Sequence, residues 1–262
     1  MSAIDAISVF TSVAFLTYGS WSDVKTREVP DRVWLALLPV AITLTSIRVA
    51  IHRELLQTSA TSVILCLIFS ALLLRSGFFG GADVKALICI SVSNPMPPMI
   101  VKPVIGFLHP FFPITVFCNS CLIALSSCVY VALRNALLLL KEGGNLFSGF
   151  EDEPAWRKAL AFVSGYKADL SDLEEKRYLY PMERLLMRRE GAMRRFTFLI
   201  DVEADREEMV EELRRHVRDG SVPREVWVSP GLPMLVFLNV GYALSTTLGD
   251  LTSLLIRGLV HP

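Results

Sequence analysis

Two short segments place an aspartate beside turn-forming residues at the end of an apolar stretch. Asp23 lies in WSDVKTREVP after the first apolar stretch, and Asp83 lies in GFFGGADVK after the third. Two carboxylates held within a few ångströms cannot both ionise easily, so they share a proton, and one acts as a base while the other stays an acid. Such a pair can activate water and polarise a carbonyl. The small residues Gly80, Gly81 and Ala82 permit a tight turn and leave room for a substrate strand.

Each aspartate also has a purely structural interpretation. A carboxylate at the edge of a membrane span is often only solvated, and Asp83 is well suited to cap a helix. The pair together favours chemistry, because ionisable residues at membrane helices are informative mainly when they meet. Glu28 and Asp31, close to Asp23 in the sequence, are expected either to attract a basic substrate or to form a solvated turn. Asp250 is a candidate intramembrane acid, with a capping role as its alternative.

The composition places these residues in a membrane protein. The chain has 262 residues, is 52% hydrophobic and has a mean hydropathy of +0.47, which disfavours a soluble enzyme. Its 26 basic and 26 acidic residues balance, so the net charge gives no indication of nucleic-acid binding. Residues 141–228 hold 16 basic and 19 acidic residues, which is 35 of the 52 formal charges. This uneven distribution predicts a membrane part and a soluble part.

About six helices are expected to form the membrane part. A helix needs about 20 mostly apolar residues to cross about 30 Å of hydrocarbon. The fourth stretch is too short to span alone if it is straight, and residues 99–113 are expected to be irregular or re-entrant. The six stretches are residues 4–21, 33–51, 59–74, 84–92, 114–140 and 232–259.

Lysine and arginine in the short loops set the expected orientation. Five basic residues fall on the side of the first and third turns, and four fall on the opposite side, which places those turns and both aspartates in the cytoplasm. We therefore expect three regions. Residues 1–140 form a membrane domain, residues 141–230 form a cytoplasmic α+β insert, and residues 231–262 form a last helix that packs with the membrane domain.

Helical and alternating patterns describe the insert in more detail. Residues 153–164, 170–189 and 205–218 have apolar residues at helical spacing. Residues 195–202 and 224–228 are rich in the β-branched and aromatic residues of strands. The insert is therefore predicted to be a small α+β module.

The two aspartate segments resemble a known family. SDVKTREVPD after the first span and GFFGGADVKAL after the third are similar to the two signature sites of the GxGD-type aspartic peptidases. The resemblance is greatest to the archaeal preflagellin peptidases, which are relatives of the type IV prepilin peptidases. Gly80, Gly81 and Asp83 agree with the GxGD motif, whereas Ala82 stands at the position of its second glycine. Lys85 follows as a supporting residue of the motif.

The resemblance implies an activity and a substrate class. It implies a multi-pass membrane endopeptidase, with Asp23 and Asp83 as the catalytic residues, that removes the short basic leader of preflagellin or other pilin-like precursors on the cytoplasmic side. The paired Cys-x-x-Cys loop of the bacterial prepilin peptidases is missing here. Cys118 and Cys121 lie in an apolar helix without a second pair, so we expect no zinc, no other cofactor and no methyltransferase activity.

Two alternatives from other functional classes remain at this stage. An ion or proton transporter would use Asp23, Asp83 and Asp250 as a relay of acids, but it should carry them near the bilayer midplane. A scaffold protein whose insert binds partners would keep its function without either aspartate. The sequence indicates no oligomeric state.

Overall fold

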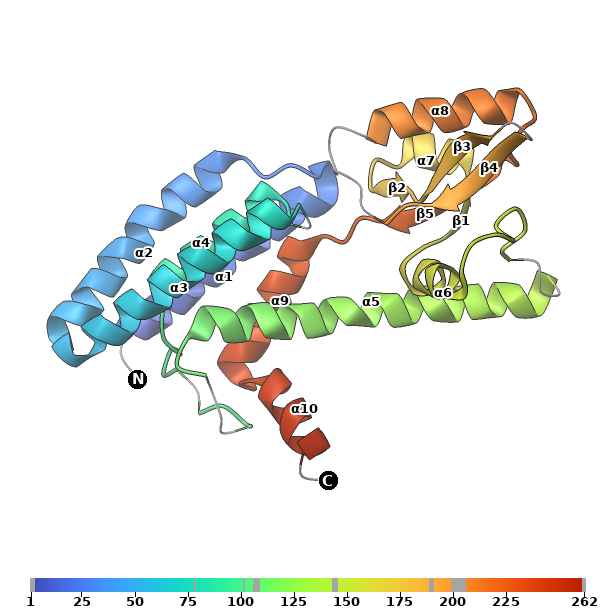
Figure 1. The fold of residues 1–262 in the computed structure, drawn as a ribbon. Helices are drawn as coiled ribbons and strands as arrows, with labels where there is room; N and C mark the ends of the chain where they lie inside the picture. Colours follow the sequence, from blue (N-terminus) through green and yellow to red (C-terminus); the bar gives the residue numbers. More distant parts are fainter. Residues whose placement is uncertain are drawn as a thin grey trace. The chain divides into compact units, whose positions relative to one another are not determined.

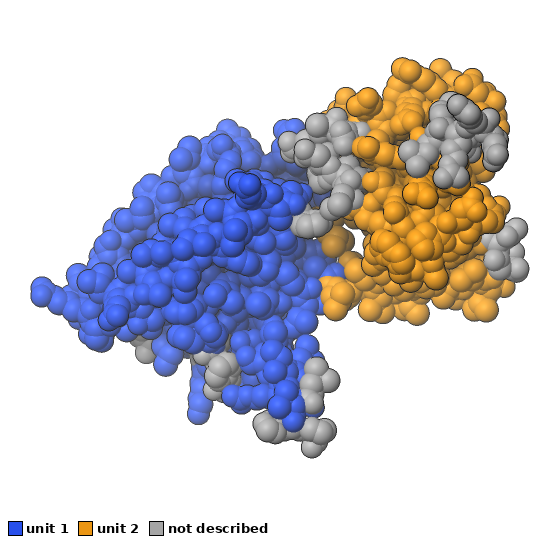
Figure 2. Space-filling view, viewed as in Figure 1, with its two compact units in different colours: residues 1–124, 233–262 blue, residues 125–232 orange. Residues whose placement is uncertain are grey.

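The computed structural model describes residues 3–77, 79–100, 102–105, 109–142, 146–188, 191–198 and 206–260. The chain divides into two compact units (Figure 2). The helical unit consists of Met1–Ala124 and Pro233–Pro262. The α/β unit consists of Leu125–Leu232, and the second half of the long helix α5 belongs to it.

Helices make up the ordered elements of the helical unit (Figure 1). A 3-10 turn, η1 (Arg53–Leu55), precedes α3. The α-helices are α1 (Ala3–Thr26), α2 (Asp31–Ile51), α3 (Leu56–Ser76), α4 (Gly81–Ser93), α5 (Phe112–Glu142), α9 (Met234–Thr247) and α10 (Leu251–Val260).

Four helices are long and apolar enough to cross a membrane: α1, α2, α3 together with η1, and α5. The pair α9 and α10 passes the same test as one segment but is bent by 73°. The predicted count of six spans is therefore not confirmed among the described residues, where the count is four or, with the bent pair, five. The polytopic helical class is confirmed.

Two predicted spans explain the lower count. Helix α4 has 13 residues, and at 1.5 Å per residue it covers only about 20 Å of the roughly 30 Å hydrocarbon layer. The predicted last span is interrupted at Gly249, whose φ of 106° is a conformation that glycine adopts without steric cost. An apolar stretch of sufficient length thus contains a sharp turn that hydropathy does not reveal.

The spanning helices bury polar side chains and expose apolar ones. Ser8 and Ser12 of α1 and Ser62 of α3 are 0%, 1% and 1% exposed. Phe10 and Ile64, on the same two helices, are 76% and 56% exposed. Small hydroxyl residues at helix interfaces with large apolar residues outside are the arrangement expected in lipid, where apolar surface needs no protection from water. Burial therefore supports the membrane assignment independently of hydropathy.

Side chains from neighbouring helices satisfy the carbonyl groups where α4 ends. Ser8 Oγ donates to the Ser93 carbonyl at 2.9 Å, and Arg48 Nη1 donates to the same oxygen at 3.4 Å. Ser62 Oγ donates to the Pro95 carbonyl at 2.6 Å. The last carbonyls of a helix lack partners within the helix, and in a membrane they must find them elsewhere in the protein. These bonds allow α4 to stop inside the unit.

Among its described residues, the α/β unit contains two small antiparallel sheets and three helices besides its part of α5. The first sheet has the order β1-β5-β2, with Tyr166 opposite Val228, and the second is the hairpin β3-β4. The elements are α6 (Ala155–Ser164), β1 (Tyr166–Asp169), α7 (Leu170–Glu175), β2 (Leu179–Pro181), β3 (Glu183–Arg188), β4 (Gly191–Phe196), α8 (Arg206–Arg218) and β5 (Glu225–Pro230).

The prediction for this region is partly confirmed. Helices α6 and α8 and strand β5 lie where the patterns predict them. The predicted helix at residues 170–189 is wrong beyond Glu175, because β2 joins the first sheet and β3 pairs with β4. The strand predicted at residues 195–202 is shifted: β4 begins earlier, at Gly191, and ends at Phe196, so residues 197–198 are not in the strand, and residues 199–202 lie outside the described residues. Pairing between strands supplies backbone hydrogen bonds that a helical pattern in one segment does not anticipate.

Aromatic residues and ion pairs form the interior of the α/β unit. Trp227 is fully buried, and Phe150 stacks on Phe196 with ring centroids 4.1 Å apart. Beside them, Glu183 accepts hydrogen bonds from Arg194 Nη2 at 2.7 and 2.9 Å, and these side chains are 1% and 7% exposed. The buried carboxylate thus has a guanidinium partner.

Candidate active site

Asp23 lies in the last turn of α1 and is partly buried. The chain leaves the helix at Arg27, whose φ is 59°, and the Arg27 N–H donates to the Asp23 carbonyl at 2.9 Å. The Arg27 side chain interacts electrostatically with the Asp23 carboxylate. Ser22 Oγ and Thr26 Oγ1 both donate to the Glu28 carbonyl, at 2.8 and 2.9 Å. These hydroxyl groups fix the turn that follows Asp23.

Asp83 is the third residue of α4 and is partly buried. Gly77 ends α3 in the left-handed conformation, with a φ of 71°, and Phe78 lies outside the described residues. The Gly80 N–H donates to Asp83 Oδ2 at 3.1 Å, so the side chain reaches back to the residue that precedes the helix. This contact satisfies one of the amide groups left without a helical partner and holds the carboxylate at the helix start.

The small residues before Asp83 differ in what they contribute. A Cβ atom on Gly81 would meet no heavy atom within 4 Å, so the space beside the helix start is open. Ala82 lies inside α4, where the helical conformation suits alanine. The methyl group at the departure from the GxGD motif therefore causes no backbone conflict.

The carboxylates of Asp23 and Asp83 interact electrostatically. Burial and the negative charge of Asp23 raise the pKa of Asp83 from its ordinary value near 3.8 to about 7, and the hydrogen bond from Gly80 opposes this rise. Asp83 belongs to α4, which is not one of the membrane-crossing helices. A carboxyl group with such a pKa exchanges a proton near neutral pH, as acid–base catalysis requires.

An ion pair joins the two aspartate segments. Lys85 Nζ lies 2.5 Å from Asp31 Oδ1, and the two side chains are 46% and 68% exposed. The cation after Asp83 thus pairs with an acid after Asp23. Glu28, the second acid of this turn, is exposed.

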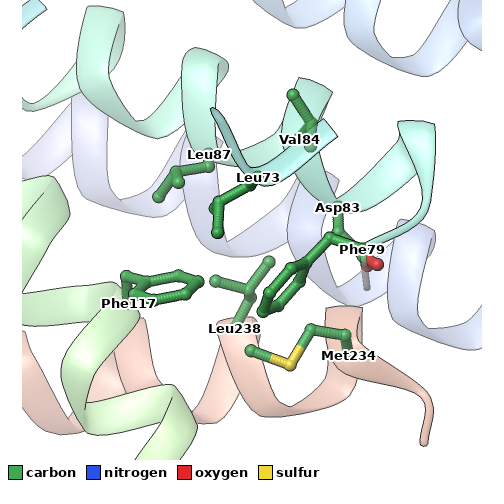
Figure 3. A pocket seen from close by; sticks show the side chains of 8 residues that line it. All are labelled: Leu73, Phe79, Asp83, Val84, Leu87, Phe117, Met234 and Leu238. Atoms are coloured by element: carbon green, nitrogen blue, oxygen red, sulfur yellow. The ribbon is translucent and has the colours of Figure 1, made fainter. Parts of the chain in front are cut away.

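A small apolar recess adjoins Asp83. Figure 3 shows the Asp83 carboxylate at one side of the recess, beside the ring of Phe79, with Met234 and Leu238 of α9 facing them. Its lining also includes Leu73, Val84, Leu87 and Phe117. Sequence analysis did not single out Phe79, Met234 or Leu238, because Met234 and Leu238 are distant in the sequence and lone apolar residues carry no motif.

Asp250 lies apart from this site. Met234, which lines the recess beside Asp83, is the first residue of α9, and Asp250 follows the last residue of that helix. The 14 residues of α9 make it about 20 Å long, so Asp250 lies about that far from Met234. The Asp250 carboxylate accepts hydrogen bonds from Ser253 N at 3.0 Å and Ser253 Oγ at 2.7 Å. It therefore caps α10.

Comparisons with known proteins give the family to which the chain is similar. Residues 10–129 match the model of the type IV leader peptidase family, and residues 157–251 match that of the type II C-terminus of archaeal A24 peptidases. A preflagellin peptidase of Methanococcus maripaludis is 24% identical over 242 residues, which cover 90% of this chain and 92% of that protein. A preflagellin peptidase of Methanocaldococcus jannaschii is 24% identical over 243 residues, with coverages of 90% and 91%.

Proposed function

Because the chain belongs to the type IV leader peptidase family, we propose that it is an aspartic endopeptidase in which Asp23 and Asp83 carry out the hydrolysis. Leader-peptide proteolysis is the activity of the family. The proposal adds the two-aspartate mechanism, the substrate class and the side of the membrane. The observation that supports it is that the negative charge of Asp23 helps to raise the pKa of Asp83, so the two acids that the sequence motifs single out influence each other.

The mechanism follows from one proton shared by the two carboxylates. The ionised carboxylate takes a proton from a water molecule, whose oxygen attacks the scissile carbonyl. The protonated carboxyl group donates a hydrogen bond to the carbonyl oxygen and so stabilises its developing negative charge. Proton transfer to the leaving nitrogen then completes cleavage of the peptide bond. The pair titrates as a unit, so the proton belongs to both residues.

The substrate in this proposal is preflagellin or another pilin-like precursor with a short basic leader. The two relatives named above are preflagellin peptidases. Glu28 and Asp31 place two acids in the turn after Asp23, and they favour a basic peptide there. Asp31 already pairs with Lys85, so the exposed Glu28 carries most of this attraction.

The same proposal assigns positions relative to the membrane. The basic residues of the short loops favour a cytoplasmic site. We assign the insert of residues 141–230 to the same side, which requires α4 and the segment before α5 together to reach the opposite face of the membrane. The mechanism requires no metal and no cofactor, because the two carboxyl groups supply both the acid and the base.

Isosteric amide variants test the proposal. Asp23→Asn and Asp83→Asn remove the proton exchange, and an asparagine at position 83 can still accept the Gly80 hydrogen bond. Asp250→Asn is the matched control, because asparagine also caps helices well. Each full-length variant is expressed in membranes and incubated with a preflagellin precursor, whose shortening is followed on a gel.

The expected result is that only the wild-type protein and Asp250→Asn shorten the precursor. Cleavage by either Asp23→Asn or Asp83→Asn at the wild-type rate would overturn the two-aspartate mechanism. Loss of activity in all three variants at equal expression would instead favour an acid relay that includes Asp250.

A further inference from the structure

A groove runs along the surface between α1 and α2. It contains about 620 Å³ of unfilled space, including the part that is open to the surroundings. Because the groove is open to its surroundings, this space is occupied by the surrounding medium or by a ligand. The groove is lined by Ala14, Phe15, Tyr18, Arg32, Val33 and Ala36.

The medium outside this groove is lipid. Both helices that form it are candidate membrane spans. Phe10, one turn before Ala14 on α1, is 76% exposed, and Leu35, beside Ala36 on α2, is 69% exposed. The alanines leave a hollow where these neighbours project outward. A flexible acyl chain fits such a hollow, because it can follow an irregular apolar surface.

The charged end of the groove has the character of a membrane interface. Tyr18 and Trp21 lie with ring centroids 6.0 Å apart, and Lys25 Nζ lies 4.9 Å from the centre of the Trp21 ring. Tyrosine, tryptophan and lysine gather at the level of lipid headgroups. Arg32 lines the groove itself, and within the described part of the chain no carboxylate forms an ion pair with it. Its guanidinium is therefore available to an anion from outside the protein.

We propose that the groove between α1 and α2 binds an anionic phospholipid, with an acyl chain between the two alanines and the phosphate on Arg32. A guanidinium binds phosphate oxygens in a two-pronged geometry. This site is separate from the Asp23 and Asp83 carboxylates, and the proposal does not depend on the proposed peptidase activity.

The dimensions favour a lipid over a helix of another protein. The lining residues of α1 run from Ala14 to Tyr18, which is about 6 Å along the helix. A helix with its side chains is about 10–12 Å across and needs a longer seam to pack. An acyl chain is narrower, and its headgroup accounts for the arginine.

Native mass spectrometry of the purified full-length protein tests the site. The protein is stripped of lipid in neutral detergent and titrated with anionic phosphatidylglycerol or zwitterionic phosphatidylcholine. Because a cation near the membrane surface contributes about 1 kcal/mol to the binding of anionic lipid, we expect wild type to bind phosphatidylglycerol about fivefold more tightly. Inorganic phosphate, which lacks an acyl chain, should not displace it.

Three substitutions and one control locate the lipid. Arg32→Gln should abolish the fivefold preference, whereas Arg32→Lys should keep most of it. Ala36→Phe fills the hollow and should weaken the binding of both lipids. Arg75→Gln is the matched control, because Arg75 is an exposed arginine at the end of α3 and does not line the groove.

Each contrary result overturns the proposal. An equal loss of preference in Arg32→Gln and Arg75→Gln would indicate diffuse attraction to the surface. The lipid would lie elsewhere if Ala36→Phe bound both lipids as tightly as wild type and Arg32→Gln kept the preference for phosphatidylglycerol over phosphatidylcholine. A photo-crosslinker at position 36 that captures a protein helix instead of lipid would identify a different occupant.

Discussion

Two carboxylates, Asp83 in the helical unit and Glu183 in the α/β unit, lie in opposite electrostatic settings. Glu183 is fully buried and pairs with Arg194 at 2.7 Å. Asp83 accepts a hydrogen bond from a backbone N–H group and faces the negative charge of Asp23. Burial raises the pKa of both carboxyl groups to about 7, but the Arg194 guanidinium opposes this rise at Glu183, whereas the negative charge of Asp23 adds to it at Asp83. This difference distinguishes structural acids from those suited to chemistry.

The largest expected effect concerns the acids suited to chemistry. Asp23→Asn, Asp83→Asn and the double variant should each lower the rate of precursor cleavage by the same factor, about 10³-fold. General acid–base catalysis contributes roughly 10²–10⁴-fold, and residues that act as a unit are not additive. Initial rates at equal protein concentration measure this. A double variant that shows the product of the two single losses would mean that the carboxylates act independently.

The next effect concerns the structural acid. Arg194→Met leaves Glu183 buried without its cation, which should lower the stability of the α/β unit by about 3–5 kcal/mol. Hydrogen exchange of peptides from β3 and β5, measured in the full-length protein, reports this loss. Asp83→Asn should not destabilise the helical unit, because it removes a repulsion between like charges.

Arg215→Met is the control for that measurement. Arg215 is 73% exposed and makes only a long contact of 3.6 Å with Glu211, so its loss should cost little. If hydrogen exchange of β3 and β5 were equally fast in Arg194→Met and Arg215→Met, the ion pair of Glu183 would stabilise the α/β unit no more than a surface ion pair does.

The pH dependence of cleavage and of stability tests the role assigned to Asp83. With the pKa of Asp83 raised to about 7, the pair keeps its shared proton below this pH and loses it above. Cleavage should therefore fall about tenfold per pH unit above about pH 7. The native state also binds a proton that the unfolded chain releases near pH 3.8, so the stability contributed by this group decreases as the pH rises from about 4 to 7. Initial rates between pH 5 and 9 test the first statement, and a rate that stays constant to pH 9 would contradict it.

The smallest effect concerns the exposed ion pair between the aspartate segments. Lys85→Gln should change activity by no more than a few-fold, because an exposed pair contributes at most about 1 kcal/mol and is screened by salt. The exchange of charges in Asp31→Lys with Lys85→Asp should recover most of the loss, as read from kcat/KM at low salt. A loss as large as that of Asp83→Asn would instead place Lys85 among the reacting groups.

The membrane fold could be predicted because apolar length leaves a strong pattern in the sequence. The shortness of α4 could also be predicted from its apolar stretch, but the hydroxyl groups of Ser8 and Ser62, which bond the carbonyls of Ser93 and Pro95 at its end, could not. In the same way, the helical spacing after Glu175 was misleading, because pairing with β4 decides the conformation of β3. Interactions between distant segments were the missing information in both regions.

In the candidate site, too, local patterns could be recognised in the sequence, whereas contacts between distant segments could not. Asp23 and Asp83 could be proposed from the sequence because each stands in a recognisable local pattern, and the negative charge of Asp23 helps to raise the pKa of Asp83. Met234 could not be found, since only the packing of α9 beside α4 makes it a neighbour of Asp83. The capping role of Asp250 became evident only with the turn at Gly249.

The hydrogen bonds at the C-terminal end of α4 restrict how its N-terminal end can move. Ser8, Arg48 and Ser62 hold the chain around Ser93 and Pro95, so a displacement of α4 along its own axis would break several of these bonds at once. A small tilt about this anchored end would keep them, and over the roughly 15 Å of helix between Ser93 and Asp83 a tilt of about 5° moves Asp83 by about 1 Å. Helix α4 is thus fixed at its C-terminal end, and a tilt displaces most the end near Asp83, where the Gly80 N–H and the ion pair of Lys85 with Asp31 are the contacts that must adjust.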